Sequence, residues 1–176
     1  MVNNLILIGI AGVGKTTIGK QIAKGLDKEF IDLDKSIELR CGVDIPTIFE
    51  IEGEEGFRKR EHFELEHVLA KSDNYVLSVG GGCIVSKHNR DLIVNSHIFV
   101  VQLYATIPVL VERLSKTSGT RPLLNGVKDP TDKITQLYQK RKQFYDEIAN
   151  LTIDTSDLRP TQTVETIIEH FKKNAR

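Results

Sequence analysis

The chain has 176 residues, which is enough for one full domain and short for two. Apolar residues make up 40% and charged residues 27%, an ordinary balance for a soluble globular protein. Its 24 basic residues equal its 24 acidic ones, so no global field recruits nucleic acid or an anionic membrane. No apolar run approaches the roughly 20 residues that a membrane helix requires.

Cysteine and histidine usage predicts neither a disulfide framework nor a metal site. Cys41 and Cys83 are the only cysteines. Together with His62, His67 and His88 they match no ligand spacing of a Cys/His metal site. The first residues have no basic region typical of a signal peptide. We therefore expect a reduced, cytoplasmic protein that forms a single domain over residues 1–176.

The first predicted elements surround a phosphate-binding loop. The apolar run Leu5–Gly9 predicts a buried strand, and Lys15–Gly25 predicts a helix closed by Gly25. Between them, Gly9–Thr16 reads GIAGVGKT, which fits Gly-x-x-x-x-Gly-Lys-Thr in the strand–loop–helix context that this motif demands. Its glycines let backbone N–H groups surround phosphate oxygens, Lys15 reaches the β- and γ-phosphates, and Thr16 offers a hydroxyl to Mg²⁺. The motif predicts a nucleoside triphosphate site without naming the reaction.

The next strand ends in two carboxylates. Phe30–Leu33 predicts a strand, and Asp32 and Asp34 project to the same face of an extended chain. That face points to the crevice where α/β sheets bind ligands. Alone, the pair would be ordinary, with Asp34 as a helix cap. Beside a phosphate loop it predicts a Mg²⁺ contact and a group that orients the acceptor.

The middle of the chain continues the alternation of helices and strands. Gly53–Arg58 leads into a charged helix, predicted over Phe57–Ala70. The strand Tyr75–Val79 ends in three glycines, Gly80–Gly82, whose missing side chains let a ligand approach the backbone.

The last third contains one segment that fits no regular element. His97–Leu103 predicts a strand and Thr106–Ser115 a helix. Lys116–Pro130 is rich in glycine and proline and predicts a long loop, which in a compact domain is usually either disordered or a functional lid. Because it carries Arg121, we favour the lid. A fifth strand, Leu151–Ile153, and a C-terminal amphipathic helix complete an α/β protein with a parallel sheet.

These motifs, taken in order, resemble the shikimate kinases. The set comprises the phosphate loop, Asp-x-Asp, Gly-Phe-Arg at Gly56–Arg58, Gly-Gly-Gly, Arg-Pro-Leu-Leu at Arg121–Leu124 and Tyr-x-x-Arg at Tyr138–Arg141. The resemblance implies ATP-dependent phosphorylation of the 3-hydroxyl of shikimate in aromatic amino-acid biosynthesis. It also implies a three-layer fold like that of the nucleoside monophosphate kinases. A five-stranded parallel sheet is flanked by helices, with a substrate-binding segment at about 34–62 and a lid at about 116–130.

The resemblance also implies roles for individual residues. Those expected to bind the nucleotide are Gly12, Val13, Gly14, Lys15, Thr16, Thr17, Arg113, Arg121 and Pro160. Those expected to bind shikimate are Asp34, Phe49, Phe57, Arg58, Glu61, Gly80, Gly81, Gly82 and Arg141. Thr16 and Asp32 would hold Mg²⁺, and Lys15, Asp34 and Arg121 would be catalytic. Two arginines suit a carboxylate because planar guanidinium groups match its geometry.

Several alternatives stay open from the sequence. Lys116 competes with Arg113 for the adenine, and Phe49 and Phe57 are equally explained as core residues. The apolar strand Tyr75–Val79 ends in Ser78 and glycines and not in the acidic residue of a typical second nucleotide motif, so the Mg²⁺ site depends on Thr16 and Asp32. A gluconate or nucleoside monophosphate kinase is the nearest rival activity, and a silent kinase-like binding protein is another. A GTPase is disfavoured because no Asn-Lys-x-Asp segment is present. We expect a monomer that binds ATP and shikimate.

Overall fold

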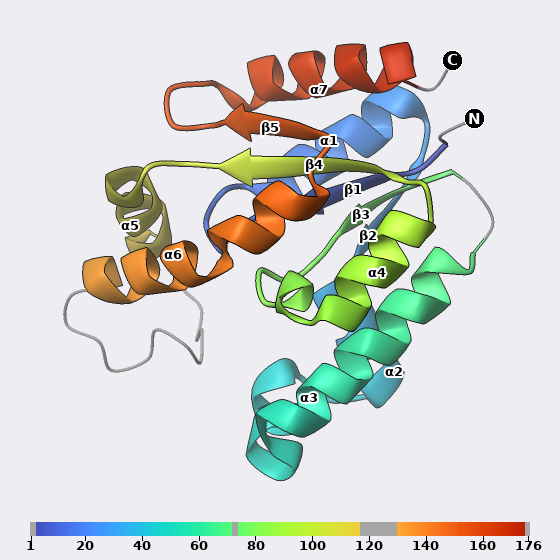
Figure 1. Ribbon diagram of the computed structural model, residues 1–176, viewed down its shortest axis with the longest axis vertical. Helices are drawn as coiled ribbons and strands as arrows, with labels where there is room; N and C mark the ends of the chain where they lie inside the picture. Colours follow the sequence, from blue (N-terminus) through green and yellow to red (C-terminus); the bar gives the residue numbers. More distant parts are fainter. Residues whose placement is uncertain (1–2, 72–73, 117–129, 175–176) are drawn as a thin grey trace.

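The structure is a computed structural model that describes residues 3–71, 74–116 and 130–174 (Figure 1). Its centre is a five-stranded sheet in the order β2-β3-β1-β4-β5, in which every neighbouring pair is parallel. The strands are β1 (Leu5–Ile8), β2 (Glu29–Asp32), β3 (Tyr75–Ser78), β4 (Phe99–Tyr104) and β5 (Leu151–Asp154). The predicted α/β class and five-stranded parallel sheet are thus confirmed, with strand bounds shifted by one or two residues.

Helices connect successive strands, as parallel pairing requires, and one further helix follows β5. They are α1 (Lys15–Leu26), α2 (Leu33–Cys41), α3 (Ile45–Leu69), α4 (Lys87–Asn95), α5 (Ile107–Ser115), α6 (Pro130–Ile148) and α7 (Pro160–Asn174), with a 3₁₀ turn, η1 (Cys83–Val85). No described helix combines the length and the apolar character that crossing a bilayer would need.

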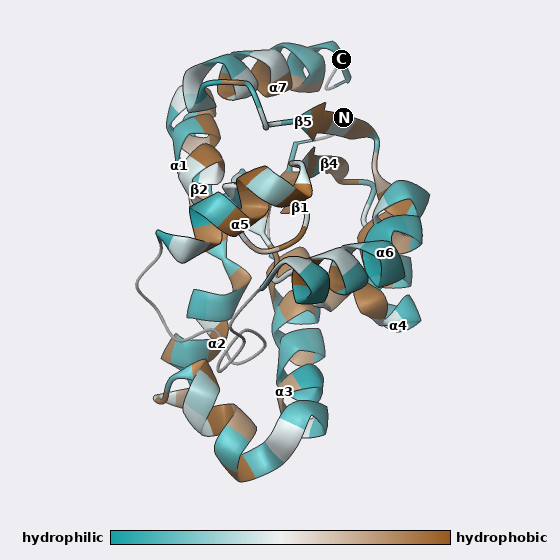
Figure 2. Cartoon of the chain, turned by 90° about the vertical axis from the view of Figure 1, so that its left-hand side faces the viewer, coloured by the Kyte–Doolittle hydropathy of each residue, from teal (hydrophilic) through white to brown (hydrophobic). Residues whose placement is uncertain are grey.

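The central strand β1 supplies both faces of the core. Its four residues are fully buried and alternate between two apolar clusters: Leu5 and Leu7 lie in one, Ile6 and Ile8 in the other. The first cluster includes residues of α1 and α7, the second includes residues of α3 and α4, and α6 contributes to both. Figure 2 shows the apolar strands between these helices. Because all five strands are parallel, their carboxyl ends lie on one edge of the sheet, where ligands bind in such folds.

Two helix boundaries differ from the sequence prediction. Helix α1 passes through Gly25 to Leu26 and is closed by Asp27, whose φ is 53°. Gly25 is therefore not the end of the helix. Helix α3 begins at Ile45, twelve residues before the predicted start, and is kinked at Gly53, where φ is 69°. The sequence pattern missed this first half because the kink interrupts the helical period.

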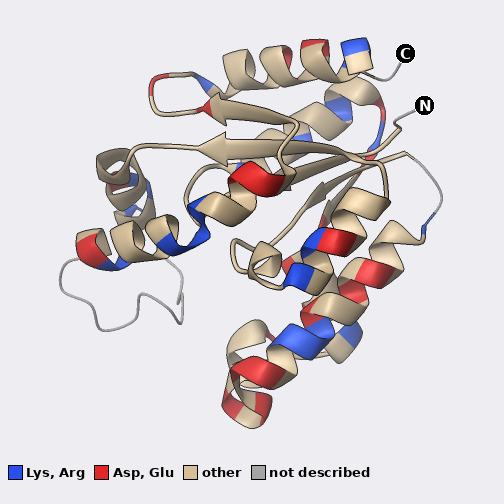
Figure 3. Ribbon diagram, in the orientation of Figure 1, with Lys and Arg blue, Asp and Glu red and all other residues tan. Residues whose placement is uncertain are grey.

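Helices α2 and α3 form an arm that projects beyond the sheet, at the bottom of Figures 1 and 2. Acidic and basic side chains are interspersed along α3 (Figure 3). Glu64 of α3 is 2% exposed and accepts hydrogen bonds from Ser36 Oγ, at 2.5 Å, and from Arg40 Nε, both in α2. This contact ties α2, which carries Asp34, to the same helix that carries Arg58. Glu64 has no local sequence signal for this role, because its partners lie more than twenty residues away.

Candidate active site

A cavity of about 1060 Å³ opens at the carboxyl ends of the strands. The predicted nucleotide, metal and acceptor residues that line it are Gly12, Val13, Gly14, Lys15, Thr16, Thr17, Asp32, Asp34, Gly80, Gly81, Arg113, Arg141 and Pro160. The fold thus brings together, in one space, residues that are spread over nearly 150 positions of the chain.

The phosphate loop joins β1 to α1 and takes a conformation that only glycine tolerates at its first position. Gly9 has a φ of 141°, and a β-carbon there would lie 2.3 Å from the carbonyl oxygen of Leu103. Lys15 curls back over the loop, where its ammonium group donates to the carbonyl oxygens of Gly9, at 2.8 Å, and Ile10, at 3.2 Å. Gly14, Lys15, Thr16 and Thr17 line the cavity, so a lysine and the positive N-terminal end of α1 adjoin it, which suits a polyphosphate.

Two oxygen groups meet at the start of α1. The hydroxyl of Thr16 donates to Asp32 Oδ2 at 3.0 Å. The other oxygen of Asp32 accepts from the backbone N–H of Lys35 at 3.4 Å, so Asp32 caps α2. The capping role considered for Asp34 is therefore wrong, because Asp34 lies two residues further along, inside the first turn of α2. A hydroxyl beside a carboxylate suits a hard cation such as Mg²⁺.

Asp34 lies beside the three-glycine turn. A β-carbon on Gly80 would lie 3.0 Å from Asp34 Oδ1 and 3.3 Å from Glu61 Oε1. The absence of a side chain at residue 80 therefore lets both carboxylates reach the turn. Burial, with the nearby charge of Asp32, raises the pKa of Asp34, and Lys15 offsets part of that rise. A carboxylate of raised basicity is suited to accept a proton or a hydrogen bond from an alcohol.

Arg58 packs flat against the same turn. A β-carbon on Gly82 would lie 2.6 Å from Arg58 Nη2, so the guanidinium group occupies the space that a side chain would need. Arg58 Nη1 donates to Glu61 Oε2 at 2.8 Å, and Arg58 Nη2 donates to Glu54 Oε1 at 3.1 Å. Burial raises the pKa of Glu61 to about 6, against the opposing charge of Arg58.

Arg141 reaches the turn from α6. Its Nη1 donates to the carbonyl oxygen of Gly81 at 3.1 Å, and the hydroxyl of Tyr145 donates to the same oxygen at 2.8 Å. Tyr145 is buried, and the sequence analysis did not single it out. Its spacing of four residues after Arg141 places the two on one helix face, a signal that was available. Arg58 and Arg141 also line a second, smaller cavity beside the turn.

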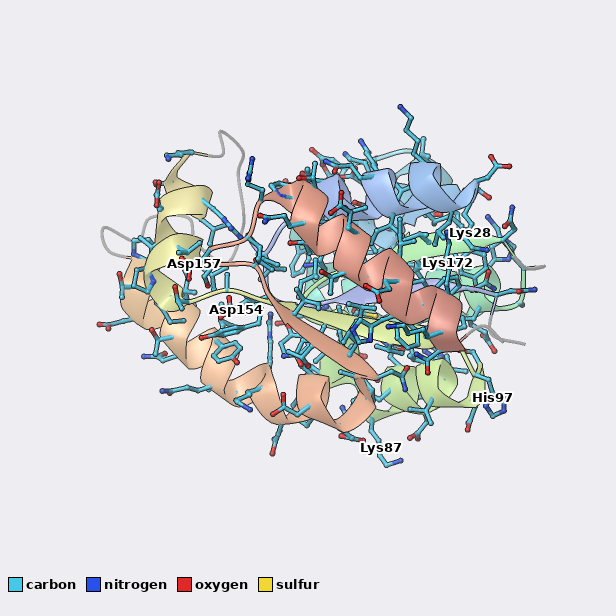
Figure 4. All side chains as sticks on the ribbon, turned by 90° about the horizontal axis from the view of Figure 1, so that it is seen from above. Lys28, Lys87, His97, Asp154, Asp157 and Lys172 are labelled. Carbon is cyan, nitrogen blue, oxygen red and sulfur yellow. The ribbon has the colours of Figure 1, made fainter. Side chains whose placement is uncertain are left out.

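The far end of the large cavity is formed by α5, the segment after β5, and α7. Arg113 donates to Thr155 Oγ1 at 3.0 Å and to the Thr155 carbonyl oxygen at 2.7 Å. Thr155 follows β5 in a turn in which Asp154 accepts from the backbone N–H and the hydroxyl of Ser156. Figure 4 labels Asp154 and Asp157 at this end of the sheet. Lys116 instead pairs with Glu112 on the surface and does not line the cavity, which favours Arg113 as the adenine contact.

Five described residues that were predicted to bind the acceptor do not line the large cavity: Phe49, Phe57, Arg58, Glu61 and Gly82. The rings of Phe49 and Phe57 lie 4.8 Å apart; Phe57 is 5% exposed in the core cluster and Phe49 packs against it. Their contact with an acceptor stays a prediction. Arg121, with residues 117–129 of the predicted lid, lies outside the described residues.

Comparison with known proteins agrees with this geometry. Residues 11–172 match the family model described as shikimate kinase. A shikimate kinase of Francisella tularensis subsp. holarctica is 48% identical over 153 residues, which cover 87% of this chain and 85% of the relative. A structure described as shikimate kinase from Acinetobacter baumannii in complex with shikimate matches with a TM-score of 0.91 at 36% identity, covering 99% of this chain and 95% of that one.

A gluconokinase from Sinorhizobium meliloti shares the fold, with a TM-score of 0.61 over 99% of this chain and 98% of that chain, but at only 15% identity. That likeness concerns the fold alone, whereas the family match begins within the phosphate loop and includes Lys15, the three-glycine turn and both Arg58 and Arg141. This chain belongs to the shikimate kinase family.

Proposed function

We propose that the protein transfers the γ-phosphoryl group of ATP to the 3-hydroxyl of shikimate, giving shikimate 3-phosphate and ADP. One observation carries this proposal above the others. A single cavity is lined by the phosphate loop with Lys15, by the carboxylate of Asp34 and by the guanidinium group of Arg141. A triphosphate, a reacting alcohol and a carboxylate therefore each have a complementary group in one space.

The nucleotide end of the cavity provides positive charge where phosphoryl transfer needs it. Phosphoryl transfer passes through a loose transition state whose charge lies on the equatorial oxygens. Lys15 would leave the carbonyl oxygens of Gly9 and Ile10 for the β- and γ-phosphates. Arg113 and Pro160 line the far end, where we expect the adenine to bind.

Thr16 and Asp32 are the residues that would hold Mg²⁺. When bound, Mg²⁺ would supply positive charge that offsets the negative charge developing on the phosphates. The described residues contain no group of three or more His, Cys, Asp or Glu side chains placed for a metal. A hydroxyl and one carboxylate nevertheless fit an ion that usually keeps several waters and binds substrate phosphates.

The acceptor end of the cavity would orient the reacting hydroxyl and select which acceptor binds. Asp34 would accept a hydrogen bond from the 3-hydroxyl and receive its proton as the phosphoryl group arrives. Arg58 and Arg141, which both approach the Gly80–Gly82 turn, would bind the carboxylate through charge-assisted hydrogen bonds. Glu61 and the backbone of the turn would contact the ring hydroxyls. Arg121 would complete the site over the transferring group.

The test is a kinetic comparison of acceptors with the purified protein. Initial rates with MgATP and shikimate, gluconate or a nucleoside monophosphate give kcat/KM for each acceptor. We expect shikimate to be preferred by orders of magnitude, and Lys15→Ala to abolish most of that turnover while Lys20→Ala, exposed on the same helix, retains it. Faster turnover of gluconate or a nucleoside monophosphate would contradict the proposal.

The proposal extends to the setting of the enzyme. We infer a cytoplasmic monomer that acts in aromatic amino-acid biosynthesis. Growth of a shikimate-kinase-deficient bacterium without aromatic supplements, restored by this chain and not by Lys15→Ala, tests the pathway. Sedimentation equilibrium tests the monomer, which is contradicted by a mass well above 19.8 kDa.

A further inference from the structure

Arg58 has two carboxylate partners that differ sharply in exposure. The side chain of Glu61, which accepts from Nη1 at 2.8 Å, is 1% exposed. The side chain of Glu54, which accepts from Nη2 at 3.1 Å, is 66% exposed. One guanidinium group is thus shared between a carboxylate inside the protein and a carboxylate in water.

The exposed carboxylate belongs to a pocket whose other charges are positive. This pocket has a volume of about 260 Å³ and is lined by Glu54, Arg58, Val85, Leu137, Lys140, Arg141 and Phe144. Arg58, Lys140 and Arg141 bring three cations to it, and Glu54 is the one anion among its lining residues. Glu54 therefore occupies, on Arg58, the kind of position that a bound carboxylate would take.

The two ion pairs differ in how easily they can be broken. Removing Arg58 Nη1 from Glu61 would leave a buried carboxylate without its partner, which is costly. Glu54 can return to water when its contact is broken, and exposed pairs of this kind contribute little. An incoming anion can therefore obtain the Nη2 donor far more cheaply than the Nη1 donor.

We propose that Glu54 is a specificity-determining residue that occupies Arg58 Nη2 until the carboxylate of the acceptor replaces it. This rests on the proposed function, in which Arg58 binds that carboxylate. An acceptor without a negative charge cannot displace Glu54, so the resident pair stays in place and the acceptor gains nothing from Arg58. Glu54 thus weakens binding of the true acceptor slightly and makes a negatively charged group a condition of productive binding.

The test uses two glutamates that are matched in sequence and in geometry. Glu54→Gln and Glu54→Ala remove the competing charge from Arg58. Glu55→Gln removes the charge that pairs with Lys59 at 2.8 Å, also at a spacing of four residues on α3 and also exposed. We expect both Glu54 variants to lower the KM for shikimate by about two- to fivefold, because exposed ion pairs usually contribute a free energy of that size. The KM for ATP and kcat should stay unchanged, and Glu55→Gln should match the wild type.

A second acceptor distinguishes competition from a general change in the site. The methyl ester of shikimate keeps the ring hydroxyls and lacks the negative charge, so its KM should not fall in the Glu54 variants. An unchanged or higher KM for shikimate overturns the proposal, and a higher one would mean that Glu54 holds Arg58 in place for the acceptor. An equal fall in the KM for the methyl ester would also overturn the proposal. If the wild type does not phosphorylate shikimate, the proposed function fails, and calorimetric affinities of shikimate for the same variants still decide the role of Glu54.

Discussion

The hydroxyl of Thr16 donates a hydrogen bond to the carboxylate of Asp32 across 3.0 Å, joining the first turn of α1 to the end of β2. Both oxygens lie on the wall of the large cavity, beside the phosphate loop. Because Asp32 also caps α2, one residue links the expected Mg²⁺ site to the helix that carries Asp34.

The first prediction separates these two roles of Asp32. Asn caps a helix as well as Asp does, so Asp32→Asn should keep α2 and its thermal stability while removing the charged metal ligand. We expect the Mg²⁺ concentration for half-maximal activity to rise about 10- to 100-fold, taking the usual cost of losing a metal contact as a guide. Thr16→Ala should behave similarly, and Thr16→Ser should stay near the wild type. Unchanged Mg²⁺ dependence in both Asp32→Asn and Thr16→Ala contradicts the metal assignment.

The second prediction concerns the two arginines. Arg58→Ala and Arg141→Ala should each lower kcat/KM for shikimate about 10- to 100-fold, because each removes a charge-assisted hydrogen bond, with the KM for ATP much less affected. The double variant should lose less than the sum of the single losses, since both residues hold one group.

Stability should distinguish the same two variants. Arg58→Ala leaves Glu61 buried without its partner and should lower the free energy of unfolding by about 1–3 kcal/mol. Arg141→Ala removes a hydrogen bond to Gly81 that Tyr145 also makes, so it should cost less. Urea unfolding of both variants at pH 7 measures this, and equal losses would count against the Arg58–Glu61 pair as a structural contact.

The third prediction follows from the pKa of Glu61, which burial raises from an ordinary value of 4.5 to about 6. Between these values the folded protein binds more protons than the unfolded chain, so stability falls as pH rises through this window. Relative to Glu61→Gln, the wild type should lose about 2 kcal/mol between pH 4 and pH 7. Urea unfolding of both proteins across this range gives the difference. A difference that grows with pH instead would mean that Arg58 outweighs burial and lowers the pKa.

The fourth prediction compares two glycines of α1. A β-carbon on Gly19 would lie 2.4 Å from the ring of Phe30 and 3.0 Å from Leu7, inside the core. Gly19→Ala should therefore destabilise the fold by about 1–3 kcal/mol through overpacking. A β-carbon on Gly25 meets only the flexible end of Ile168, at 2.8 Å, so Gly25→Ala should be near neutral, within about 0.5 kcal/mol. Thermal unfolding compares them, and equal effects would contradict the packing of α1 on β2.

The sequence by itself determined the features that depend on neighbouring residues. The phosphate loop, the apolar run of β1 and the start of α1 are contiguous, and their chemistry is set by the motif Gly9–Thr16 and by the period of the side chains. The strands β1, β3 and β4 were recognisable because strands buried on both faces are largely apolar. The edge strands β2 and β5 are only partly buried and were recognisable as shorter apolar runs. The order of the motifs was enough to indicate the family.

The tertiary structure decided everything that joins distant segments. Arg141 donates to the carbonyl oxygen of Gly81, 60 residues earlier in the chain. Glu64 of α3 binds Arg40 of α2, and Arg113 of α5 binds Thr155, which lies between β5 and α7. None of these contacts has a local signal, since a charged residue on a helix looks the same in sequence whether water or a buried partner faces it. The kink at Gly53 likewise hid the first half of α3, and with it the proximity of Glu54 to Arg58. Which donors of Arg58 are already occupied is a property of packing, because the burial of each carboxylate depends on the elements around it.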